Sequence, residues 1–468
     1  MAAQPDFKLA LPPDFEGQVL KVGDHGYDDA RLIFNMRWHE SQPALIAQPA
    51  NVADVQVLMR YASAHDIPVA VRGGGHGIDG TSMPHNQLVI DMCPFKEIVV
   101  DPTSRTVRTG AGVLLSELDA ACQQHSMVVP SGTVSSTGIA GLTLGGGIGY
   151  NMRRYGATVD SLLACDVVTV DGRLVRASKS ENSDLFWALC GGGGNFGIVT
   201  AFEYRLHPLD NIVGQAFLLY DLDEAKAMLL DLCTFMKTAR RELSVIVILA
   251  PIPPMPTISP EHYGVAKMAV HAVFTGDLDQ FDGVINEITA LRKPSQVVKG
   301  QAPWVEVNRM LDNLAPFGRR SHLRGGYMDP AVDGVIDIIT AGALRAPPSN
   351  HPAPSTIQNI WFFGGAISED FEEDSVAFSR DGAVCMWECF AQWDTADDDA
   401  NFQGWIDTIA DELGPKLRAN GYINLTTDRG QEWLRGAFGS SEKYARLLAA
   451  KAKWDPKNLL RFNKNLVI

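Results

Sequence analysis

Three segments of this chain consist largely of glycine, and they restrict what it can fold into and bind. They are RGGGHG at Arg72–Gly77, SGTVSSTGIAGLTLGGGIGY at Ser131–Tyr150 and CGGGGNFGIVT at Cys190–Thr200. Glycine permits backbone conformations with positive φ, and its N–H group can approach a ligand without hindrance from a Cβ atom. One such segment is explained as well by tight turns as by binding. Three in one region favour a large anionic ligand, and a dinucleotide fits best.

Length and charge narrow the class of protein. A chain of 468 residues exceeds one ordinary globular core, which predicts two large domains or one domain with a substantial insertion. Forty basic and fifty-five acidic side chains give a formal net charge of −15. Such a charge repels phosphate backbones and anionic lipid at long range, so neither nucleic acid nor a membrane is expected as a partner.

The sequence shows no recognisable targeting or metal-binding signal. Its start, MAAQPDFKLALPPDFEG, has neither a basic region followed by an apolar run nor a twin arginine, and no apolar stretch reaches spanning length. We therefore expect a cytoplasmic protein. The cysteines are odd in number and lack zinc-ligand spacing, which favours reduced, mostly buried thiols and no metal site. They are Cys93, Cys122, Cys165, Cys190, Cys233, Cys385 and Cys389.

Patterns along the chain indicate mixed α and β structure. The first 210 residues alternate between short β-branched runs and helical spacing, and Asp171–Gly172 joins two strand-like runs as a hairpin. From about residue 211 glycine becomes less frequent. The aromatic and β-branched runs Thr356–Ile367 and Ala383–Trp393 predict central strands of a separate sheet. Helical spacing at Lys443–Ala452 predicts a helix near the end of the chain.

The second glycine segment also raises the alternative of a Rossmann-type site. Gly145, Gly147 and Gly149 approach a G-x-G spacing, and Asp166 or Asp171 follows about twenty residues later. That fingerprint requires a strand, a tight turn and a helix in immediate succession. Here the glycines close a long loop-like segment, and Asp171 is better used in the hairpin turn. The context argues against this alternative.

Four motifs in a fixed order resemble those of a known family. They are RGGGHG after a strand, SGTVSSTGIAGLTLGGGIG, the run DGRLVRASKSENSDLFWALCGGGGNFGIVT, and DPKNLLRFNKN near the C-terminus. Together they resemble the berberine-bridge-enzyme-like FAD-linked oxidases of the vanillyl-alcohol-oxidase superfamily. In length the chain is similar to the bacterial 6-hydroxynicotine-oxidase type. The resemblance covers residues from about 40 to 210 and the last 25 residues.

The resemblance implies an α+β fold. It comprises a PCMH-type FAD-binding domain and a substrate domain with an antiparallel sheet flanked by helices. We expect the FAD-binding domain at residues 1–210, with its core at about 40–210, and the substrate-binding domain at 211–440. Residues 441–468 are expected to return to the FAD-binding domain.

The resemblance also implies how FAD is held. In the family the histidine of the RGGGH loop bonds to the flavin 8α-methyl carbon, and the matching residue is His76. The bond requires a neutral imidazole, which is available for much of the time near neutral pH. The pyrophosphate would lie against the backbone of Arg72–Gly77, and the isoalloxazine near Gly132–Gly138. The implied FAD-binding residues are His76, Arg72, Gly73, Gly74, Gly75, Gly77, Gly132, Thr133, Thr137, Gly138, Gly141, Gly146, Gly147, Gly149, Asn195, Gly197, Ile198, Val199, Asn463 and Asn465.

Two positions depart from the family pattern beside the flavin. Many relatives hold FAD by a second bond from a cysteine in a G-x-C-x-x-V-G pattern, whereas this chain reads GTVSSTG, with Val134 at the cysteine position. A single covalent link, through His76, is therefore expected. Thr137 falls where relatives carry a valine or leucine that governs oxygen access. Its β-branched shape favours an oxidase that returns electrons to O₂.

The substrate half shows less resemblance, and it leaves the catalytic base open. Relatives often carry a Y-x-N-Y segment whose last tyrosine is the base, but this chain reads YINL at Tyr422–Leu425. The candidates for catalysis are therefore Tyr422, Asn424 in the same segment, and Glu388. No side chain is needed if the substrate is an amine able to lose hydride directly. A base requires both reach and a suitable pKa, and the sequence supplies neither.

The two predicted central strands carry further candidates. Neighbouring Trp387 and Phe390 would raise the pKa of Glu388, but an alternating strand places the carboxylate in solvent equally well. Aromatic side chains with an amide suit a flat or cyclic substrate, and they suit an ordinary core nearly as well. The substrate candidates, which share one face of their strand, are Asn359, Trp361 and Phe363.

The implied reaction is an FAD-dependent oxidation. A hydride passes from a C–H bond next to oxygen or nitrogen of a small organic substrate to the flavin, and O₂ then reoxidises the flavin with release of hydrogen peroxide. A dehydrogenase with another electron acceptor is the first alternative, and peroxide release distinguishes it. A nicotinamide-dependent Rossmann enzyme would purify colourless. A non-catalytic flavin-binding protein would stay oxidised when offered substrates without oxygen.

Overall fold

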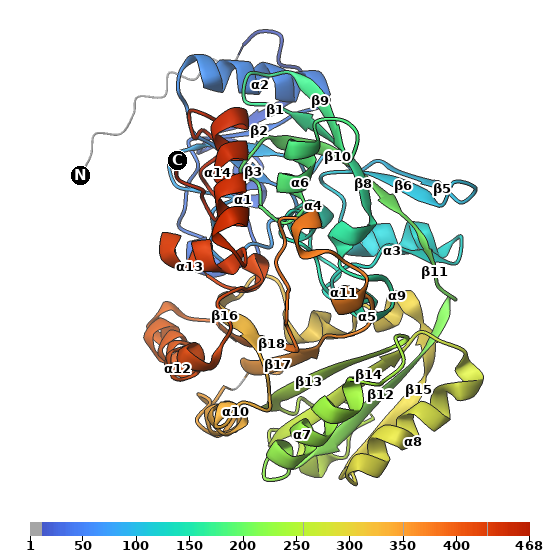
Figure 1. The fold of residues 1–468 in the computed structure, drawn as a ribbon. Coiled ribbons are helices and arrows are strands. Elements are labelled where there is room, and N and C mark those ends of the chain that lie inside the picture. The colour runs from blue at the N-terminus through green and yellow to red at the C-terminus, as the bar shows by residue number, and fades with distance from the viewer. Residues whose placement is uncertain (1–11, 256, 350, 428) are drawn as a thin grey trace.

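The structure, a computed structural model, describes residues 12–255, 257–349, 351–427 and 429–468 and has the expected α+β fold (Figure 1). The first eleven residues, on which the expectation about targeting largely depends, lie outside the described part. An N-terminal region is built on two main sheets, and a second region is built on one seven-stranded sheet. Among the described helices, none combines the length and apolar character needed to cross a bilayer.

The first sheet leads directly to the first glycine segment. Its elements are β1 (Gln18–Leu20), α1 (Tyr27–Ala30), β2 (Leu45–Gln48), α2 (Val52–Ala64), β3 (Val69–Arg72) and β4 (Leu88–Asp91). The strand order is β1-β2-β4-β3, with β2 and β3 both parallel to β4. Helix α2 begins where the Asn51 side chain accepts a hydrogen bond from the Asp54 amide. The strand β3 ends at Arg72, so its carboxyl end delivers the RGGGHG segment.

The other two glycine segments lie in the region of the second sheet, between its strands and helices. Its region contains β5 (Ile98–Asp101), β6 (Thr106–Gly110), α3 (Leu115–Gln123), β7 (Met127–Val128), α4 (Ile139–Leu144), α5 (Met152–Tyr155), β8 (Leu162–Val168), β9 (Leu174–Ser178), α6 (Ser183–Leu189), β10 (Ile198–Arg205) and β11 (His207–Pro208). The order is β5-β6-β10-β8-β9, and β7 pairs separately with β11. The expected hairpin joins β8 and β9, and Gly172 in its turn has φ 80°.

The Rossmann alternative is wrong for a local reason. The glycines at 145–149 follow the short helix α4 rather than a strand, and α5 starts only at Met152. Asp171 lies in the β8–β9 turn, where it accepts a hydrogen bond from Arg173 Nε at 2.7 Å. The succession of strand, turn and helix that places a dinucleotide on a helix N-terminus is therefore missing.

The second region is an antiparallel sheet covered by helices on one face. Its elements are β12 (Ile212–Tyr220), α7 (Ala225–Met236), β13 (Leu243–Pro251), β14 (Ala266–Phe274), α8 (Phe281–Leu291), β15 (Gln296–Pro303), α9 (Trp304–Val307), β16 (Arg320–Met328), α10 (Val335–Leu344), β17 (Thr356–Phe362), α11 (Ala366–Glu369), β18 (Cys385–Trp393) and α12 (Asp399–Leu413). The strand order is β15-β12-β14-β13-β17-β18-β16. Helices α7, α8, α10 and α12 lie on the face turned away from the N-terminal region (Figure 1).

Alternation along the strands gives the sheet two different faces. In β18, Trp387 packs in the core under the covering helices, whereas Met386 and Phe390 belong to the core shared with the N-terminal region. We call the latter the inner face. The predicted strand at 356–367 ends early, at Phe362, because Gly364 and Gly365 follow with φ of 100° and 61°.

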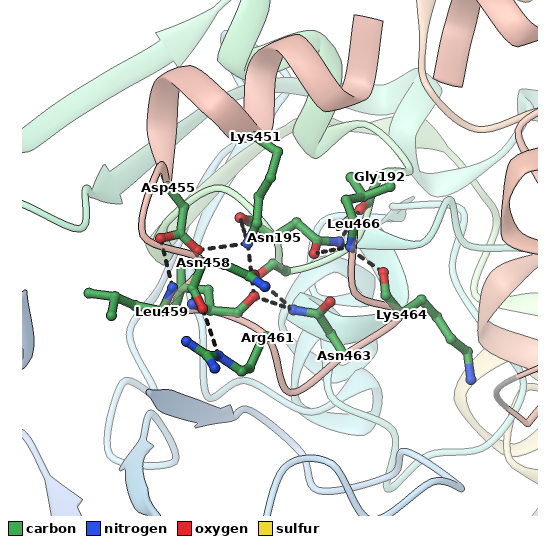
Figure 2. A network of polar contacts seen from close by, with 12 residues as sticks. Gly192, Asn195, Lys451, Asp455, Asn458, Leu459, Arg461, Asn463, Lys464 and Leu466 are labelled. Carbon is green, nitrogen blue, oxygen red and sulfur yellow. Dashed lines mark hydrogen bonds and ion pairs between the residues drawn. The ribbon is translucent and has the colours of Figure 1, made fainter. Parts of the chain in front are cut away.

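The end of the chain returns to the N-terminal region. Helices α13 (Gly430–Ala437) and α14 (Ser441–Trp454) precede the tail, and α14 contacts α6. Lys451 of α14 is fully buried and donates to Asp455 Oδ2 at 2.6 Å and to the Asn195 carbonyl at 3.0 Å (Figure 2). Asp455 in turn accepts from the Leu459 amide at 2.9 Å. This ion pair fixes the tail against the third glycine segment.

We expect Lys451→Met to destabilise the protein markedly. It would leave Asp455 buried without its cation, and breaking a buried ion pair on one side costs about 3–5 kcal/mol. A fall of several degrees in the melting temperature, measured by circular dichroism, is the expected result. Lys453→Met on the same helix is the matched control, because the Lys453–Asp184 pair is exposed and such pairs contribute at most about 1 kcal/mol. Equal shifts in the two variants would contradict a specific role for Lys451.

Candidate active site

A cavity of about 430 Å³ lies between the glycine segments and the inner face of the seven-stranded sheet. All three glycine segments contribute to its wall, and so do β16, β17, β18, the loop at 421–426 and the C-terminal tail. Segments separated by hundreds of residues therefore meet at one site. The three strands come from the middle of the sheet to its edge, in the order β17-β18-β16.

The glycines of this wall serve two different purposes. A Cβ atom on Gly74 would lie 2.4 Å from the Gly138 nitrogen, so the first two segments touch backbone to backbone. At Gly77, Gly141 and Gly194 an added Cβ would meet nothing within 4 Å, and all three line the cavity. Bare main chain therefore faces an open space there. Such a surface fits a ligand whose phosphates contact backbone N–H groups.

Most residues implied to bind FAD meet at this cavity. Those that line it are His76, Gly73, Gly74, Gly75, Gly77, Gly132, Thr133, Thr137, Gly138, Gly141, Gly197, Ile198, Val199 and Asn463. The buried Oδ1 atom of Asn463 has no hydrogen-bond partner within the described residues, while its Nδ2 donates to the Gly194 carbonyl at 3.2 Å. An acceptor without a donor at the cavity wall is a further feature that fits a bound dinucleotide.

Three glycines implied to bind FAD do not line the cavity. Gly146 and Gly147 have φ of 126° and 82°, and Gly149 is so close to the main chain that a Cβ would lie 1.8 Å from the Ser131 carbonyl oxygen. These glycines are needed for turns and for close packing rather than for contact with the cavity. Contact between these glycines and FAD stays a prediction.

Three polar residues implied to bind FAD also do not line the cavity. Arg72 is buried and donates through Nε to Asp91 Oδ1 at 2.8 Å, so its guanidinium fixes the end of β3. Asn195 is fully buried and donates to the Gly192 carbonyl at 2.9 Å, within the network of Figure 2. The backbone carbonyl of Asn465 accepts from Gln431, and its buried side-chain Oδ1, which has no partner within the described residues, does not line the cavity.

His76 lies on the cavity wall as a neutral imidazole. Its ring stacks on Phe34 with centroids 4.0 Å apart, and its Nε2 atom is 3.1 Å from Ser136 Oγ. Burial lowers the pKa of His76 to about 4, although a hydrogen bond to its own backbone opposes the shift. The ring is therefore uncharged at neutral pH, which is the state required of a nucleophilic nitrogen.

The second glycine segment presents no thiol to the cavity. Val134 and Thr137 both line it, at the positions where the family pattern would place a cysteine and the oxygen-controlling residue. None of the seven cysteines, all of which fall within the described residues, belongs to the lining. Cys93 is the least buried of them, and its sulfur donates to the Gly73 carbonyl.

Glu388 faces the cavity from the inner face of β18, so the alternative that it faces solvent is wrong. Trp361 Nε1 donates to its carboxyl at 3.4 Å, and Asn359, directly opposite on β17, also hydrogen-bonds to it. Burial raises the pKa of Glu388 to about 7, and these two hydrogen bonds oppose the shift. Trp387, expected to share these surroundings, points instead into the core on the other face.

Tyr422 and Asn424 also line the cavity, but their polar atoms are engaged. The Tyr422 hydroxyl oxygen accepts from the Gly147 amide at 3.2 Å and from Asn424 Nδ2 at 3.1 Å. Burial raises the pKa of Tyr422 to about 12 despite these donors. Asn424 Nδ2 also donates to the Leu142 carbonyl at 3.0 Å, so it holds the second glycine segment in place.

Two of the three substrate candidates are brought together with Glu388. Asn359 and Trp361 line the cavity, whereas Phe363 lies beyond the end of β17 and packs against Tyr327 with centroids 5.5 Å apart. Phe363 is therefore excluded from the lining. The early end of the strand, described above, removes it from the row of side chains that reach the cavity.

Some lining residues were not foreseen. Phe34 lies before every motif, and nothing in its local sequence marks it. Phe390 and Lys464 had a signal, because Phe390 alternates with Glu388 and Lys464 lies within the terminal FNKN motif. The apolar residues of the 3₁₀ helix at Met310–Leu314 and the strands were also missed; the lining includes Leu311, Leu314, Ala315, Leu323 and Ile357.

Two protein families match separate parts of the chain. The FAD binding domain family matches residues 43–178, and the berberine and berberine-like family matches residues 421–466. The first match contains the first two glycine segments with His76, and the second contains Tyr422 and the terminal motif. Fold, site and matches define the class: the protein is an FAD-linked oxidoreductase.

Individual relatives agree over the full length. An FAD-linked oxidoreductase of Dictyostelium discoideum is 29% identical over 96% of this chain and 94% of its own. The structure of 6-hydroxy-D-nicotine oxidase from Arthrobacter nicotinovorans superposes with a TM-score of 0.85 at 24% identity, covering 98% of this chain and 100% of that chain. BBE-like 1 of Physcomitrella patens superposes with a TM-score of 0.85 at 22% identity, covering 97% and 98%. The two family matches and these relatives agree with the berberine-bridge-enzyme-like PCMH flavoprotein that the four motifs predicted.

Proposed function

We propose that the protein is an oxidase that removes hydrogen from a C–H bond next to nitrogen or oxygen of a small organic substrate and passes the electrons to O₂ as hydrogen peroxide. One observation carries this proposal: a neutral histidine and a half-buried carboxyl, His76 and Glu388, line the same glycine-walled cavity. We further propose residues 1–210 with 441–468 as the FAD-binding part and residues 211–440 as the substrate-binding part.

The test is a mixing experiment without oxygen. Alcohols, sugars, cyclic amines and hydroxylated aromatics are each added to the yellow protein, and loss of flavin absorbance is followed. Bleaching followed by peroxide release on admission of air supports an oxidase. Bleaching that is reversed only by another acceptor supports the dehydrogenase, for which Thr137 is the position to examine. A flavin that no compound reduces would support a non-catalytic protein.

The residues that would contact FAD are mostly backbone groups, and few of them carry a charge. We propose that Gly73–Gly77, Gly138–Gly141 and Gly193–Val199 hold the dinucleotide through backbone N–H groups, with Asn463 Oδ1 as an acceptor. When bound, FAD accepts two electrons and a hydrogen from a C–H bond of the substrate. The protein's own contribution is to orient the substrate, exclude water and exchange a proton.

We propose that His76 carries the FAD through a covalent bond. The bond would form with loss of one hydrogen from the flavin methyl group and of the imidazole proton, and the two electrons released would be taken up by O₂. Ser136 is placed to orient the ring, because its hydroxyl lies 3.1 Å from Nε2. Stacking on Phe34 restricts rotation of the same ring.

Ser136→Ala is expected to lower the fraction of protein with covalently bound flavin several-fold, because the imidazole loses the hydrogen bond that fixes its orientation. The measurement is the yellow colour kept in an acid-precipitated pellet relative to total flavin. Ser136→Thr retains the hydroxyl and should restore the fraction. Ser135→Ala is the matched control, since the Ser135 hydroxyl donates to Asp312 at 2.6 Å and not to His76. Unchanged attachment in Ser136→Ala would rule out the positioning role.

We propose a single covalent link, because Val134 replaces the cysteine and no described lining residue is a thiol. Alkylation of every cysteine in the unfolded holoprotein is therefore expected to leave all the flavin attached. The measurement is mass spectrometry of the flavin-bearing peptide after proteolysis, which should contain His76 alone. A flavin-bearing cysteine peptide would contradict this proposal.

We propose Glu388 as the group that accepts the substrate proton. A pKa near 7 lets a carboxyl exchange protons at neutral pH, whereas the pKa of about 12 leaves the Tyr422 phenol protonated. Trp361 and Asn359 orient the carboxyl through their hydrogen bonds. We assign Asn424 a positioning role, because its amide spans the Tyr422 hydroxyl and the second glycine segment.

A further inference from the structure

The part of the cavity formed by the sheet and the neighbouring 3₁₀ helix is predominantly apolar. Aromatic and aliphatic side chains cover most of this wall, and the polar groups among them are few. An apolar wall holds ring-shaped hydrocarbon surface well and offers little to a polyhydroxylated molecule. The apolar members are Leu311, Leu314, the adjoining Ala315, Leu323, Ile357 and Phe390.

The charges of the lining are unevenly distributed. Lys464 forms an ion pair with Asp79 at the tail side of the cavity. Glu388 is the carboxyl on the sheet side, and its hydrogen bonds come from the neutral donors Trp361 and Asn359. Among the described lining residues, no cationic side chain is paired with Glu388. A buried carboxylate without a cation is electrostatically uncompensated.

A second acceptor lies beside this carboxyl. The buried Oδ1 atom of Asn359 has no hydrogen-bond donor within the described residues. Asn359 and Glu388 are directly opposite one another on β17 and β18, so both acceptors come from rigid strands in the middle of a sheet. Two neighbouring acceptors, one of them ionisable, match a ligand that brings N–H donors and a positive charge.

We propose that the substrate is a small cyclic amine, largely apolar, whose N–H groups bind Glu388 and Asn359 while its ring packs against the apolar wall. This inference depends on the proposed function and specifies its substrate class. A carboxylate or phosphate substrate would bring a second negative charge to Glu388 without a cation to receive it. A sugar would leave most of its hydroxyl groups without partners on the apolar wall.

The proton and electron balance of an amine oxidation suits these residues. The ammonium group transfers its proton to the Glu388 carboxylate, which leaves a neutral amine with a free lone pair. The neutral amine then loses a hydrogen with two electrons from the adjacent carbon to FAD, and it becomes an iminium ion. One proton on Glu388 and two electrons on FAD account for the oxidation, and O₂ takes up the electrons as hydrogen peroxide.

The test uses ligands that cannot be oxidised at the carbon next to the polar group. 1-Methylcyclohexylamine, 1-methylcyclohexanol and 1-methylcyclohexanecarboxylate have nearly the same shape and carry no hydrogen on that carbon. Their dissociation constants for the FAD-loaded protein are measured by titration calorimetry at pH 8, with glucose as the polar comparison. We expect the amine to bind about ten- to a hundredfold more tightly than the alcohol, which is typical of a hydrogen bond to a charged group.

Two further measurements make the result specific. Glu388→Gln should reduce the preference for the amine over the alcohol to about the level of neutral hydrogen bonding, with little change for the alcohol. In the unmodified protein at pH 6, where Glu388 is largely protonated, binding of the amine should release a proton, seen as heats that depend on the ionisation enthalpy of the buffer. Tyr422 and Cys389 are titratable groups that interact electrostatically with Glu388, and both are protonated at these pH values.

The outcomes separate the two proposals. Binding of the alcohol or the carboxylate as tightly as the amine, or an amine preference that persists in Glu388→Gln, would overturn the assignment of an amine. Tight amine binding with a flavin that no oxidisable amine bleaches would support the amine site and contradict the proposed oxidase. Rapid bleaching by sugars alone would leave the oxidase in place and overturn the amine.

Discussion

His76→Ala is expected to release all of the flavin into the supernatant when the protein is precipitated with acid, whereas the unchanged protein keeps its yellow colour in the pellet. Alanine has no nitrogen that could bond to the cofactor. His76 is the lining residue whose neutral ring is both stacked, on Phe34, and hydrogen-bonded, to Ser136. Non-covalent binding of FAD should persist, because the glycine cradle is unchanged. The measurement is the flavin absorbance of pellet and supernatant.

A nearby histidine provides the control. His85→Ala should keep the covalent flavin, because His85 is exposed and its Nδ1 accepts from the Gln42 amide outside the cavity. Flavin lost equally from the unmodified protein would show that no covalent link exists. Flavin retained in the His76→Ala pellet would show that another residue carries it.

Glu388→Gln is expected to lower kcat/KM by about 10²–10⁴-fold on a substrate that bleaches the flavin, which is the usual contribution of a general base. Glutamine keeps the size and the hydrogen bonds with Trp361 and Asn359 but cannot accept a proton. The measurements are anaerobic flavin reduction and peroxide formation. Tyr422→Phe is the comparison, and it should cause a much smaller loss, since the phenol with a pKa of about 12 does not exchange its proton at neutral pH.

The rate of substrate oxidation should depend on pH through the protonation of Glu388. Burial raises the pKa of its carboxyl from 4.5 to about 7, so the carboxylate that accepts a proton forms only as the pH rises through this value. In the unmodified enzyme kcat/KM should increase with pH on a limb centred near 7, and Tyr422→Phe should preserve that limb. Its persistence in Glu388→Gln would assign the limb to another group.

The local sequence predicted the glycine segments, which present their main chain to a ligand, better than the residues on the substrate side of the cavity. Glycine is selected where a Cβ has no room or where backbone must face a ligand, and Gly74 against Gly138 shows the first case directly. The same chemistry makes turn glycines resemble binding glycines: Gly146 and Gly147, predicted to bind FAD, have positive φ values that also serve a turn. Composition alone does not separate the two uses.

The substrate side of the cavity was predicted less well, because the sequence of a strand does not tell whether its face borders solvent, a core or the cavity. Alternation puts Glu388 and Phe390 on one face of β18, but a period of two does not tell whether that face borders solvent or a cavity. Trp387, adjacent in sequence, lies in the opposite core. Phe34 reaches the site only through tertiary packing, so no local pattern marks it. Phe363 packs on the inner face, as its alternation with Asn359 and Trp361 predicts. It does not line the cavity, because Gly364 and Gly365 end the strand before it.

The return of the tail determines when the cofactor can be captured. Leu460, Phe462, Asn463 and Lys464 all belong to the cavity wall, and the Lys451–Asp455 pair holds them there. During synthesis the glycine loops leave the ribosome hundreds of residues before this last wall exists. A nascent chain therefore has an incomplete cavity. The wall around the dinucleotide is complete only once the residues after α14 have been synthesised. We therefore expect flavin to bind only after the whole chain has been synthesised.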